Sequence, residues 1–364
     1  MDRGFATSTS TSNDELKVSP TTTQQMPPGT FAPQITKPWC EALVELSQPS
    51  ATDACLDLAS GGGVNAFVIA DAIEEAKLWG PPAGAGALGG AHNLAGSVLG
   101  LDRSREALSK AKEALKAKQL KGEGSVPVRF EWADAVDKDS PWHETKKKRF
   151  ARAYCDNGMQ FFQNPEEACK RVRESLIPGG AFVVSVWGPL RPETQPLFYS
   201  AYTAMAEVLN GMDNSDSWVN ASRAETIAQF GDPFSWVSAT DQNPNSSAIE
   251  RLEEVLIKSG FDAPDAATEK ASHARFENLE QAAAACVGSM SFLEKFKTLN
   301  SGDAYAQFLE SFERQLLQNA GSSEVIQFEA QPGSTTVGQK GEGSFISVPA
   351  TAYFAHATAP WRKR

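Results

Sequence analysis

The sequence lacks a long apolar run and closely spaced cysteines. Its longest apolar candidate, Ala181–Trp187, is much shorter than the run of about 18 residues that a membrane-spanning helix needs. The five cysteines are an odd number, lie far apart and include no CxxC pair. This spacing gives no zinc motif and is typical of a reducing compartment. We therefore expect no integral membrane segment and no bound metal.

Positive charge is also in short supply. The formal net charge is −11, which argues against a nucleic-acid backbone as the main partner and favours a small-molecule substrate. Hydrophobic residues make up 41% and charged residues 22% of the chain, proportions that are ordinary for a soluble globular protein. The length of 364 residues predicts one large domain with insertions, or two domains.

Large apolar residues are scarce in residues 1–30, which are rich in Ser, Thr and Pro. We expect this stretch to be a disordered tail. Asp14 and Glu15 argue against a transit peptide, and the stretch holds no apolar signal-peptide region. With no readable targeting signal, we expect a cytoplasmic location.

What the chain does have is an apolar run, a glycine-rich turn and a helical pattern in direct succession at Cys55–Ile69. The apolar run ends at Asp57. Ala59, Gly61 and Gly63 then follow at alternate positions, which lets the backbone bend sharply and approach a ligand closely. The free amides at the start of the helix suit a carboxylate or a phosphate. The stretch therefore predicts a nucleotide-like ligand.

Three interpretations of this stretch stay open. Gly61-x-Gly63-x-x-Ala66 satisfies the dinucleotide fingerprint, which predicts an NAD(P)-dependent oxidoreductase with a ribose-binding acid about 20 residues further on. Asp102 lies almost twice that distance beyond the turn. Asp57 instead suits a ligand with an ammonium group near the turn, such as S-adenosylmethionine. In the third interpretation the glycines only make a tight connection between strand and helix.

Acidic residues recur where predicted strands end. After the first strand, strands are expected at Ser97–Leu101, Val126–Trp132, Phe150–Tyr154 and Ala181–Trp187, with helices between most of them. This alternation predicts a parallel, helix-covered sheet whose ligand lies beyond the carboxyl ends of the strands. Asp57, Asp102, Asp134 and Cys155-Asp156 all fall at such ends. Asp102 would accept from both ribose hydroxyls, or from helix amides.

The second half of the chain is mostly helical in pattern. Helices are expected at Pro196–Leu209, Arg223–Phe230, Ala248–Ser259, Leu279–Leu299 and Ala304–Asn319, and strands near Thr268–Phe276 and at Ser344–Ala357. A loop containing Trp218 is expected between the first two helices. We expect these two helices to cap the acceptor site, and the last two to add to the cap.

The block CDNGMQFFQNPEEACKRVRESLIPGGAFVVSVWG follows the fourth strand. With it the chain resembles the class I S-adenosylmethionine-dependent methyltransferases, and more narrowly their small-molecule branch related to ubiquinone/menaquinone biosynthesis (methyltransferase type 11). DLASGGG is similar to the glycine motif of that family, LGLDRSREAL to its second-strand motif and WADA to its third. The resemblance runs in order from about Phe31 to Trp187.

The resemblance implies both a fold and a reaction. The fold is α/β, a doubly wound, mostly parallel seven-stranded sheet with helical cap insertions and an antiparallel last strand between the fifth and the sixth. The reaction is transfer of a methyl group from S-adenosylmethionine to an oxygen, nitrogen or carbon of a small-molecule acceptor. A cofactor-binding protein of this fold without catalytic activity remains an alternative, as does the oxidoreductase.

The site residues that the resemblance implies come from the strand ends. Asp57 and the amides of Ala59, Gly61 and Gly63 would hold the methionine end of the cofactor, Asp102 the ribose, Asp134 and Ala135 the adenine, and the backbone of Cys155 would lie beside the sulfonium. Phe161, Phe162 and Trp187 would line the acceptor pocket, or else belong to the core. No catalytic base is assigned, because the candidates His143, His273 and Asp156 are not distinguished by sequence.

We expect four segments along the chain: a tail (1–30), a cofactor-binding core (31–188), a helical cap (189–247) and the C-terminal part of the same fold (248–360). Three features depart from the family pattern. They are a long Gly/Ala-rich insertion before the second strand, a serine/glycine variation in the glycine turn and an extended C-terminal half. They leave the implied cofactor residues in place, so they bear on the acceptor and not on the reaction.

Overall fold

The computed structural model describes residues 33–79, 96–137, 140, 150–231, 236, 244–264, 266–287, 292–298, 302–320, 327–329 and 345–360. Their strands are β1 (Ala54–Leu58), β2 (Ser97–Asp102), β3 (Val128–Trp132), β4 (Phe150–Cys155), β5 (Leu176–Trp187), β6 (Ala266–Phe276), β7 (Gln327–Glu329) and β8 (Phe345–Thr358). Their helices are α1 (Pro33–Ser47), α2 (Val64–Trp79), α3 (Arg105–Leu120), the short 3-10 helix η2 (Met159–Phe161), α4 (Pro165–Ser175), α5 (Pro196–Asn210), α6 (Ser217–Gly231), α7 (Pro244–Lys258), α8 (Leu279–Val287), α9 (Leu293–Thr298) and α10 (Asp303–Ala320).

The strands form one mixed sheet in the order β3-β2-β1-β4-β5-β8-β6, with the short β7 paired to β8 outside this path. Neighbours from β3 to β5 run parallel, whereas β8 runs antiparallel to β5 and β6. The last strand therefore lies between the fifth and the sixth. This order confirms the predicted mostly parallel sheet of seven strands, to which the structure adds β7.

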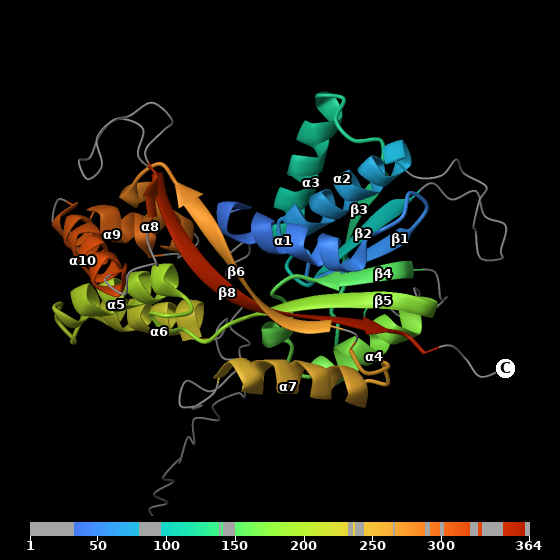
Figure 1. Cartoon of the computed structure of the whole chain (residues 1–364). Coiled ribbons are helices and arrows are strands. Elements are labelled where there is room, and N and C mark those ends of the chain that lie inside the picture. The colour runs from blue at the N-terminus through green and yellow to red at the C-terminus, as the bar shows by residue number, and fades with distance from the viewer. Residues whose placement is uncertain are drawn as a thin grey trace, which may run out of the picture.

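Helices cover both faces of the sheet. Figure 1 shows α1, α2 and α3 on one face and α4 and α7 on the other. The first face buries the apolar side of α2, including Ile69 and Ile73, and the second buries Val172 of α4 and Leu252 of α7. Each helix thus hides one apolar stripe against the strands, as a doubly wound sheet requires. The carboxyl ends of β1 to β4 stay at one edge of this sandwich.

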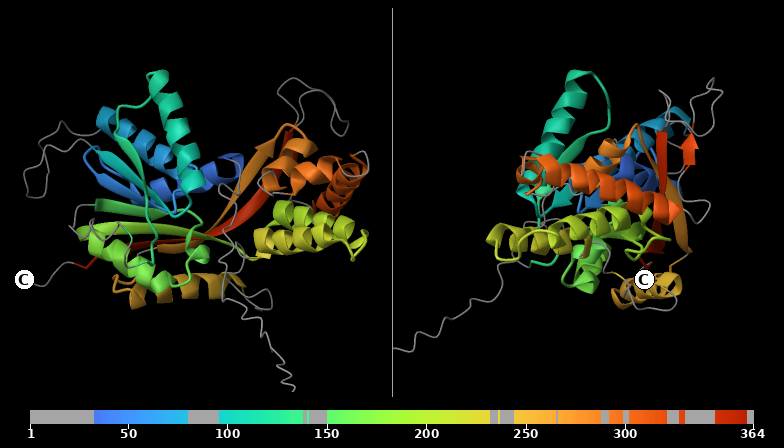
Figure 2. Two further views of the ribbon diagram at one scale, coloured as in Figure 1. Left: turned by 180° about the vertical axis from the view of Figure 1, so that it is seen from behind. Right: turned by 90° about the vertical axis from the view of Figure 1, so that its left-hand side faces the viewer.

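A second group of helices lies beyond the carboxyl end of β5. Trp187, the last residue of β5, pairs with Ala352, so the residues of β8 before Ala352 extend past β5 and pair with β6 and β7. Helices α5, α6, α8, α9 and α10 gather on this extension (Figures 1 and 2). We call these five helices the helical group. It lies on the side of the sheet to which the strand-end acids belong.

The structure corrects two expectations. Trp218 lies in α6 and not in a loop, because the Asp216 carboxylate accepts a hydrogen bond from the Trp218 amide at 2.8 Å and the helix already begins at Ser217. The helix expected over 279–299 is two helices, α8 and α9. Helix α1 contacts β5, β6 and β8.

Several expectations fall on residues outside the described part of the chain. These are the tail at 1–30, the Gly/Ala-rich insertion before β2 and His143. Within the described residues, no helix combines the length and the apolar character needed to cross a membrane.

Candidate functional site

The turn between β1 and α2 has the backbone that its small residues predict. Ala59, Gly61 and Gly63 have φ values of 56°, 52° and 87°, in the left-handed region that L side chains rarely adopt. At Gly63 a Cβ would lie 2.7 Å from Cζ of Phe130, so only glycine fits there without a shift of the Phe130 ring. A left-handed alanine is strained, and such strain gathers at binding sites. The alternation of small residues is therefore needed to shape this turn.

Asp57 lies inside β1 with a side chain that is 0% exposed. Its Oδ1 accepts a hydrogen bond from Nδ2 of Asn65 at 2.6 Å. Among the described residues, Asp57 Oδ2 and Asn65 Oδ1 are buried without a hydrogen-bond partner. Burial is the main reason why the pKa of Asp57 is raised to about 8; the Asn65 hydrogen bond opposes this rise, and the carboxylates of Asp156 and Asp102 add to it. Two buried acceptors that need donors fit a ligand ammonium group.

Asp102, at the end of β2, joins two loops. Its Oδ2 accepts from the Gly61 amide at 2.8 Å and its Oδ1 from the Ser104 amide at 2.7 Å. The Ser104 hydroxyl, not Asp102, caps α3 by accepting from Ala107. Burial raises the pKa of Asp102. A carboxylate has about four lone-pair sites, so each oxygen keeps capacity for a ribose hydroxyl.

The turn after β3 is held in place from two sides. Asp134 Oδ1 accepts from the Val136 amide at 2.9 Å, and the Asp134 amide donates to Oγ of Ser140 at 2.9 Å. The Ala135 carbonyl accepts from Nη1 of the buried Arg171 at 2.9 Å. Asp134 therefore presents its second oxygen from a fixed turn, where an adenine amino group would find an acceptor.

The end of β4 packs closely against the turn after β1. Cys155 is 0% exposed, and Asn157 has a φ of 47°. A Cβ on Gly158 would lie 2.6 Å from Cβ of Ala59 and 2.8 Å from Sγ of Cys155. The structure thus brings the predicted residues Ala59 and Cys155 to the same glycine, and a side chain at Gly158 would collide with both.

Asp156 is half-buried among side chains from three elements. Its Oδ1 accepts from Oγ of Ser185 on β5 at 2.8 Å and from Nδ2 of Asn157 at 3.0 Å. Its Oδ2 accepts from Sγ of Cys40 on α1 at 3.4 Å. Burial raises the pKa of Asp156 to about 6, although the Ser185 and Cys40 hydrogen bonds lower it. The carboxylate is therefore held in a fixed orientation at the strand ends.

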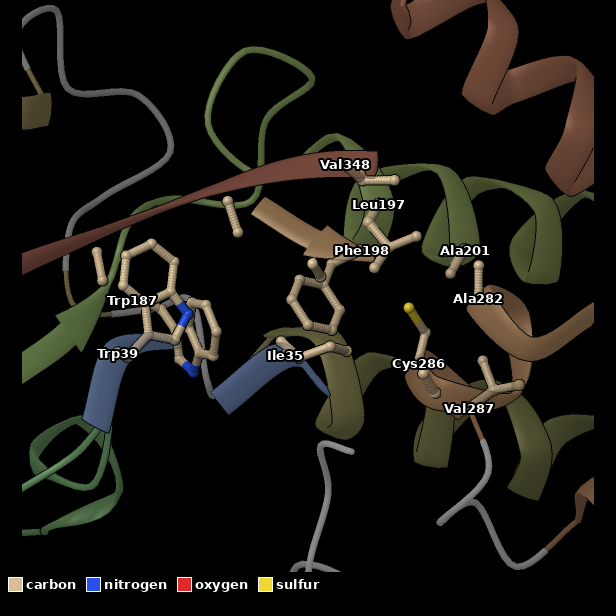
Figure 3. Close-up of a cluster of buried hydrophobic side chains, with 14 of the residues drawn as sticks. Ile35, Trp39, Trp187, Leu197, Phe198, Ala201, Ala282, Cys286, Val287 and Val348 are labelled. Atoms are coloured by element: carbon tan, nitrogen blue, oxygen red, sulfur yellow. The ribbon is translucent and has the colours of Figure 1, made fainter. Parts of the chain in front are cut away.

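The three aromatic residues predicted for the acceptor pocket do not form one wall. Trp187 is 0% exposed and packs edge-on against Trp39 of α1 and Phe198 of α5, with ring centroids 5.9 and 5.5 Å apart (Figure 3). Phe162 packs into the core on the other face of the sheet, and Phe161 is half-buried in η2. Trp187 thus belongs to the core, which was the other interpretation of these rings.

The candidate bases are also separated. His273 is exposed on β6, where it pairs with Pro349 beyond the carboxyl end of β5. Asp156 is the candidate near Asp57, since it follows two residues after Tyr154, the partner of Asp57 in the sheet, and its charge contributes to the raised pKa of Asp57.

Sequence reasoning missed Asn65 and Cys40. Asn65 carries a readable signal, since it is a polar residue in the first turn of an otherwise apolar helix. Cys40 carries none, because it meets Asp156 across 116 residues of chain.

Residues 49–223 match the family model of a methyltransferase domain, and no curated protein matches the chain. Among solved structures, the [4+2]-cyclase SpnF is 13% identical, with 89% of this chain and 81% of that chain covered at a TM-score of 0.42. The YcgJ protein from Bacillus subtilis is 11% identical, with 88% and 97% covered at a TM-score of 0.42. Phosphoethanolamine N-methyltransferase 2 from Haemonchus contortus, in complex with S-adenosylmethionine, is 14% identical, with 89% and 52% covered at a TM-score of 0.39.

Likenesses at these identities and TM-scores carry no conclusion about activity. The family model covers β1 to α5 and the N-terminal part of α6, a range that includes every strand end described above. Its match agrees with the sheet order and with the motifs after β1, β2, β3 and β4. Residues 49–223 form a methyltransferase domain, so the chain is an S-adenosylmethionine-dependent methyltransferase and S-adenosylmethionine is its cofactor.

Proposed function

We propose that the methyl acceptor is a small molecule, methylated on an oxygen, nitrogen or carbon. The observation that carries this proposal is that the chain covers its own strand ends. Cys40 of α1 donates to Asp156, and Trp39 of α1 packs on Trp187, from which the chain continues into α5. A site overlaid by α1 suits a small ligand better than a macromolecular surface. The net charge of −11 also disfavours nucleic acid. The narrower relation to the ubiquinone/menaquinone branch stays a prediction.

The proposed binding mode assigns each strand end a part of the cofactor. Asp57 holds the ammonium group, Asp102 the ribose hydroxyls, Asp134 and Ala135 the adenine, and the Cys155 backbone lies beside the sulfonium. When bound, the cofactor supplies an electrophilic methyl group on a good leaving group. The residues of the chain then have to orient the acceptor and exclude water, and this positioning lowers the barrier.

We also propose the segment roles and the cellular setting. Residues 31–188 form the cofactor-binding core, 189–247 a helical cap and 248–360 the rest of the fold, with 1–30 as a tail. The contacts of α5 with α8 and α10 support a cap that draws on both later segments. We propose a cytoplasmic enzyme that acts without a nucleic-acid partner.

Calorimetry on the purified protein tests the binding mode. We expect micromolar binding of S-adenosylmethionine and no binding of NADPH. Asp102→Ala should weaken the binding of S-adenosylmethionine by about 10- to 100-fold, the effect of losing one or two hydrogen bonds to a charged group. Asp71→Ala is the matched control, because Asp71 is an exposed acid of α2 that pairs with Lys118. Binding of NADPH, or an Asp102→Ala variant that binds as the wild type does, contradicts the proposed mode.

A labelling experiment tests the acceptor class. The enzyme is incubated with methyl-labelled S-adenosylmethionine and a cell extract separated by size. We expect label in the small-molecule fraction, lost with Asp57→Ala. Label that enters only protein or nucleic acid would overturn the small-molecule proposal and leave the methyltransferase assignment intact.

A further inference from the structure

Two neighbouring carboxylates of the site have no positive partner. Asp57 pairs in register with Tyr154, and Asp156 lies two residues beyond Tyr154 at the end of β4. The charge of each carboxylate raises the pKa of the Cys40 thiol, and the charge of Asp156 also raises the pKa of Asp57. Among the described residues, no Lys, Arg or His forms an ion pair with either carboxylate. Buried carboxylates stay ionised only where positive charge compensates them and otherwise bind a proton, so a cationic ligand would supply the charge that keeps both of them ionised.

S-adenosylmethionine brings two positive centres, an ammonium group and a sulfonium, whereas its product S-adenosylhomocysteine keeps only the ammonium group. The two centres differ in chemistry. An ammonium group has three N–H donors, while a sulfonium has charge but no donor. The two carboxylates differ correspondingly in whether their oxygens already have hydrogen-bond donors.

Asp57 has an oxygen without a hydrogen-bond donor, whereas both oxygens of Asp156 already have donors. Asp57 Oδ2 is buried without a hydrogen-bond partner, as is the neighbouring Asn65 Oδ1. Both oxygens of Asp156 already accept hydrogen bonds, Oδ1 from Ser185 and Asn157 and Oδ2 from Cys40. The carboxylate of Asp156 therefore offers a ligand negative charge more than directional hydrogen bonding.

From this difference we propose that Asp156 faces the sulfonium, and that its charge makes the protein prefer the cationic cofactor to the neutral thioether product. The inference rests on the proposed function, since it takes the binding mode with Asp57 on the ammonium group as given. It assigns to Asp156 a specificity role. After methyl transfer the sulfonium charge is gone, and the uncompensated carboxylate favours product release.

The groups around Asp156 fit this role. The titratable groups that face it are Cys40 from α1, Asp57 from β1 and Cys155 from β4. Burial raises the pKa of the Cys40 thiol, and the charges of Asp156 and Asp57 raise it further, so Cys40 remains a neutral donor. Ser185 donates from β5. None of these groups brings positive charge.

The test compares the affinities of S-adenosylmethionine and S-adenosylhomocysteine by calorimetry at pH 7.5, with sinefungin, whose protonated amine replaces the sulfonium methyl, as a third ligand. In Asp156→Asn the preference for S-adenosylmethionine over S-adenosylhomocysteine should fall by about 10- to 100-fold, the effect of losing one short-range charge interaction in a partly buried site. The affinity for sinefungin should change in the variant as the affinity for S-adenosylmethionine does. Asp102→Asn is the matched control, because the ribose is common to all three ligands. It should weaken them equally and leave the preference unchanged.

Proton linkage gives a second readout. Measured at pH 6.5 in buffers of different ionisation enthalpy, the wild type should release fewer protons on binding S-adenosylhomocysteine than on binding S-adenosylmethionine, because only the sulfonium displaces a proton from Asp156. Asp57 contributes equally to both and cancels. Asp156→Asn should remove the difference. If that variant does not fold, Ser185→Ala is the substitute, because it keeps the Asp156 carboxylate and removes one of its donors. The loss of this hydrogen bond should raise the pKa of Asp156, so the preference for S-adenosylmethionine should decline at a higher pH than in the wild type.

The outcomes separate the two levels of inference. An Asp156→Asn protein that binds both ligands with the wild-type preference overturns the role of Asp156 and leaves the binding mode standing. Failure of the wild type to bind S-adenosylmethionine overturns the binding mode, and with it this assignment.

Discussion

The strand-end site and the helical group differ in how their buried side chains are packed and paired. Around Asp57 the structure buries acceptors without donors and backbone in the left-handed region. In the helical group, aromatic rings follow one another from Trp218 through Phe292, Phe296 and Phe308 to Phe312 with centroids 5.9 to 6.4 Å apart. The first arrangement presents clustered acceptors that a ligand can satisfy, whereas the second is held together by ring packing, although Ser222 Oγ and Arg223 Nε of α6 are also buried without a partner.

This difference shows where binding and stability are separated. Unsatisfied polar atoms lower the stability of the free protein and are kept where a ligand completes them. Ring packing supplies stability and fixes the positions of α6, α9 and α10 relative to one another. Mutations in one region should therefore change one property and leave the other unchanged.

The largest effect is expected in the ring series. Phe308 is 0% exposed and is stacked on Phe312. Phe308→Ala should lower the free energy of unfolding by about 3–5 kcal/mol, because it removes buried area and leaves a cavity. The affinity of the folded protein for S-adenosylhomocysteine should stay within about twofold, since distant sites are nearly independent. Denaturant unfolding and calorimetry measure the two quantities, and a loss of affinity as large as the loss of stability would remove the separation.

Substitution of the two glycines in the turn after β1 should lower the free energy of unfolding by different amounts. Gly63→Ala should lower the free energy of unfolding by about 2–4 kcal/mol, the sum of left-handed strain and contact with Phe130. Gly61→Ala meets no atom within 4 Å of the new Cβ, so it should cost only the strain, about 1 kcal/mol. Thermal unfolding compares the two variants. Equal losses would mean that close packing on Phe130 does not restrict position 63.

The affinity of the site should depend on pH through Asp57. Because burial raises its pKa to about 8, the free protein binds a proton there at pH 6, and an ammonium ligand has to displace it. Affinity for S-adenosylhomocysteine should therefore rise by about tenfold per pH unit between about pH 5.5 and 7. Calorimetry across this range measures the slope, and S-adenosylhomocysteine is used because it has no sulfonium.

Asp57→Asn is the control for this slope and should flatten it. The same shift acts on stability in the opposite direction. The folded pKa lies above the ordinary value of 3.8, so the stabilisation is complete below that value and is lost as pH rises through about 8. The variant should not show this loss. A wild-type slope that persists in Asp57→Asn would assign the titration to another group.

The smallest effect is expected at the surface of the helical group. Nζ of Lys295 lies 4.5 Å from the ring centroid of Trp218. Lys295→Met keeps the aliphatic stem and removes the charge, so the free energy of unfolding should fall by about 0.5–1 kcal/mol. Lys295→Arg should retain the stability. A change in cofactor affinity in either variant would link the two regions more closely than the structure indicates.

Local patterns predicted the elements that carry the site. Helix α2 spans Val64–Trp79 as its apolar spacing indicates, and β8 lies between β5 and β6 as the resemblance implied. Prediction was wrong for Trp218, where an aspartate cap extends α6. The residue roles at the strand ends stay predictions, although Gly61 and Asp102 are in hydrogen-bond contact.

The sequence by itself determined the order of strands and helices, the left-handed turn at Gly61 and Gly63, and the placing of acids at the ends of β1, β2, β3 and β4. Those features follow from periodicity and backbone freedom within a few residues. Only the tertiary structure decided that Cys40 meets Asp156 and that Trp187 is enclosed by Trp39 and Phe198. These contacts join distant parts of the chain, and their existence depends on which helix faces pack together, which no local pattern records.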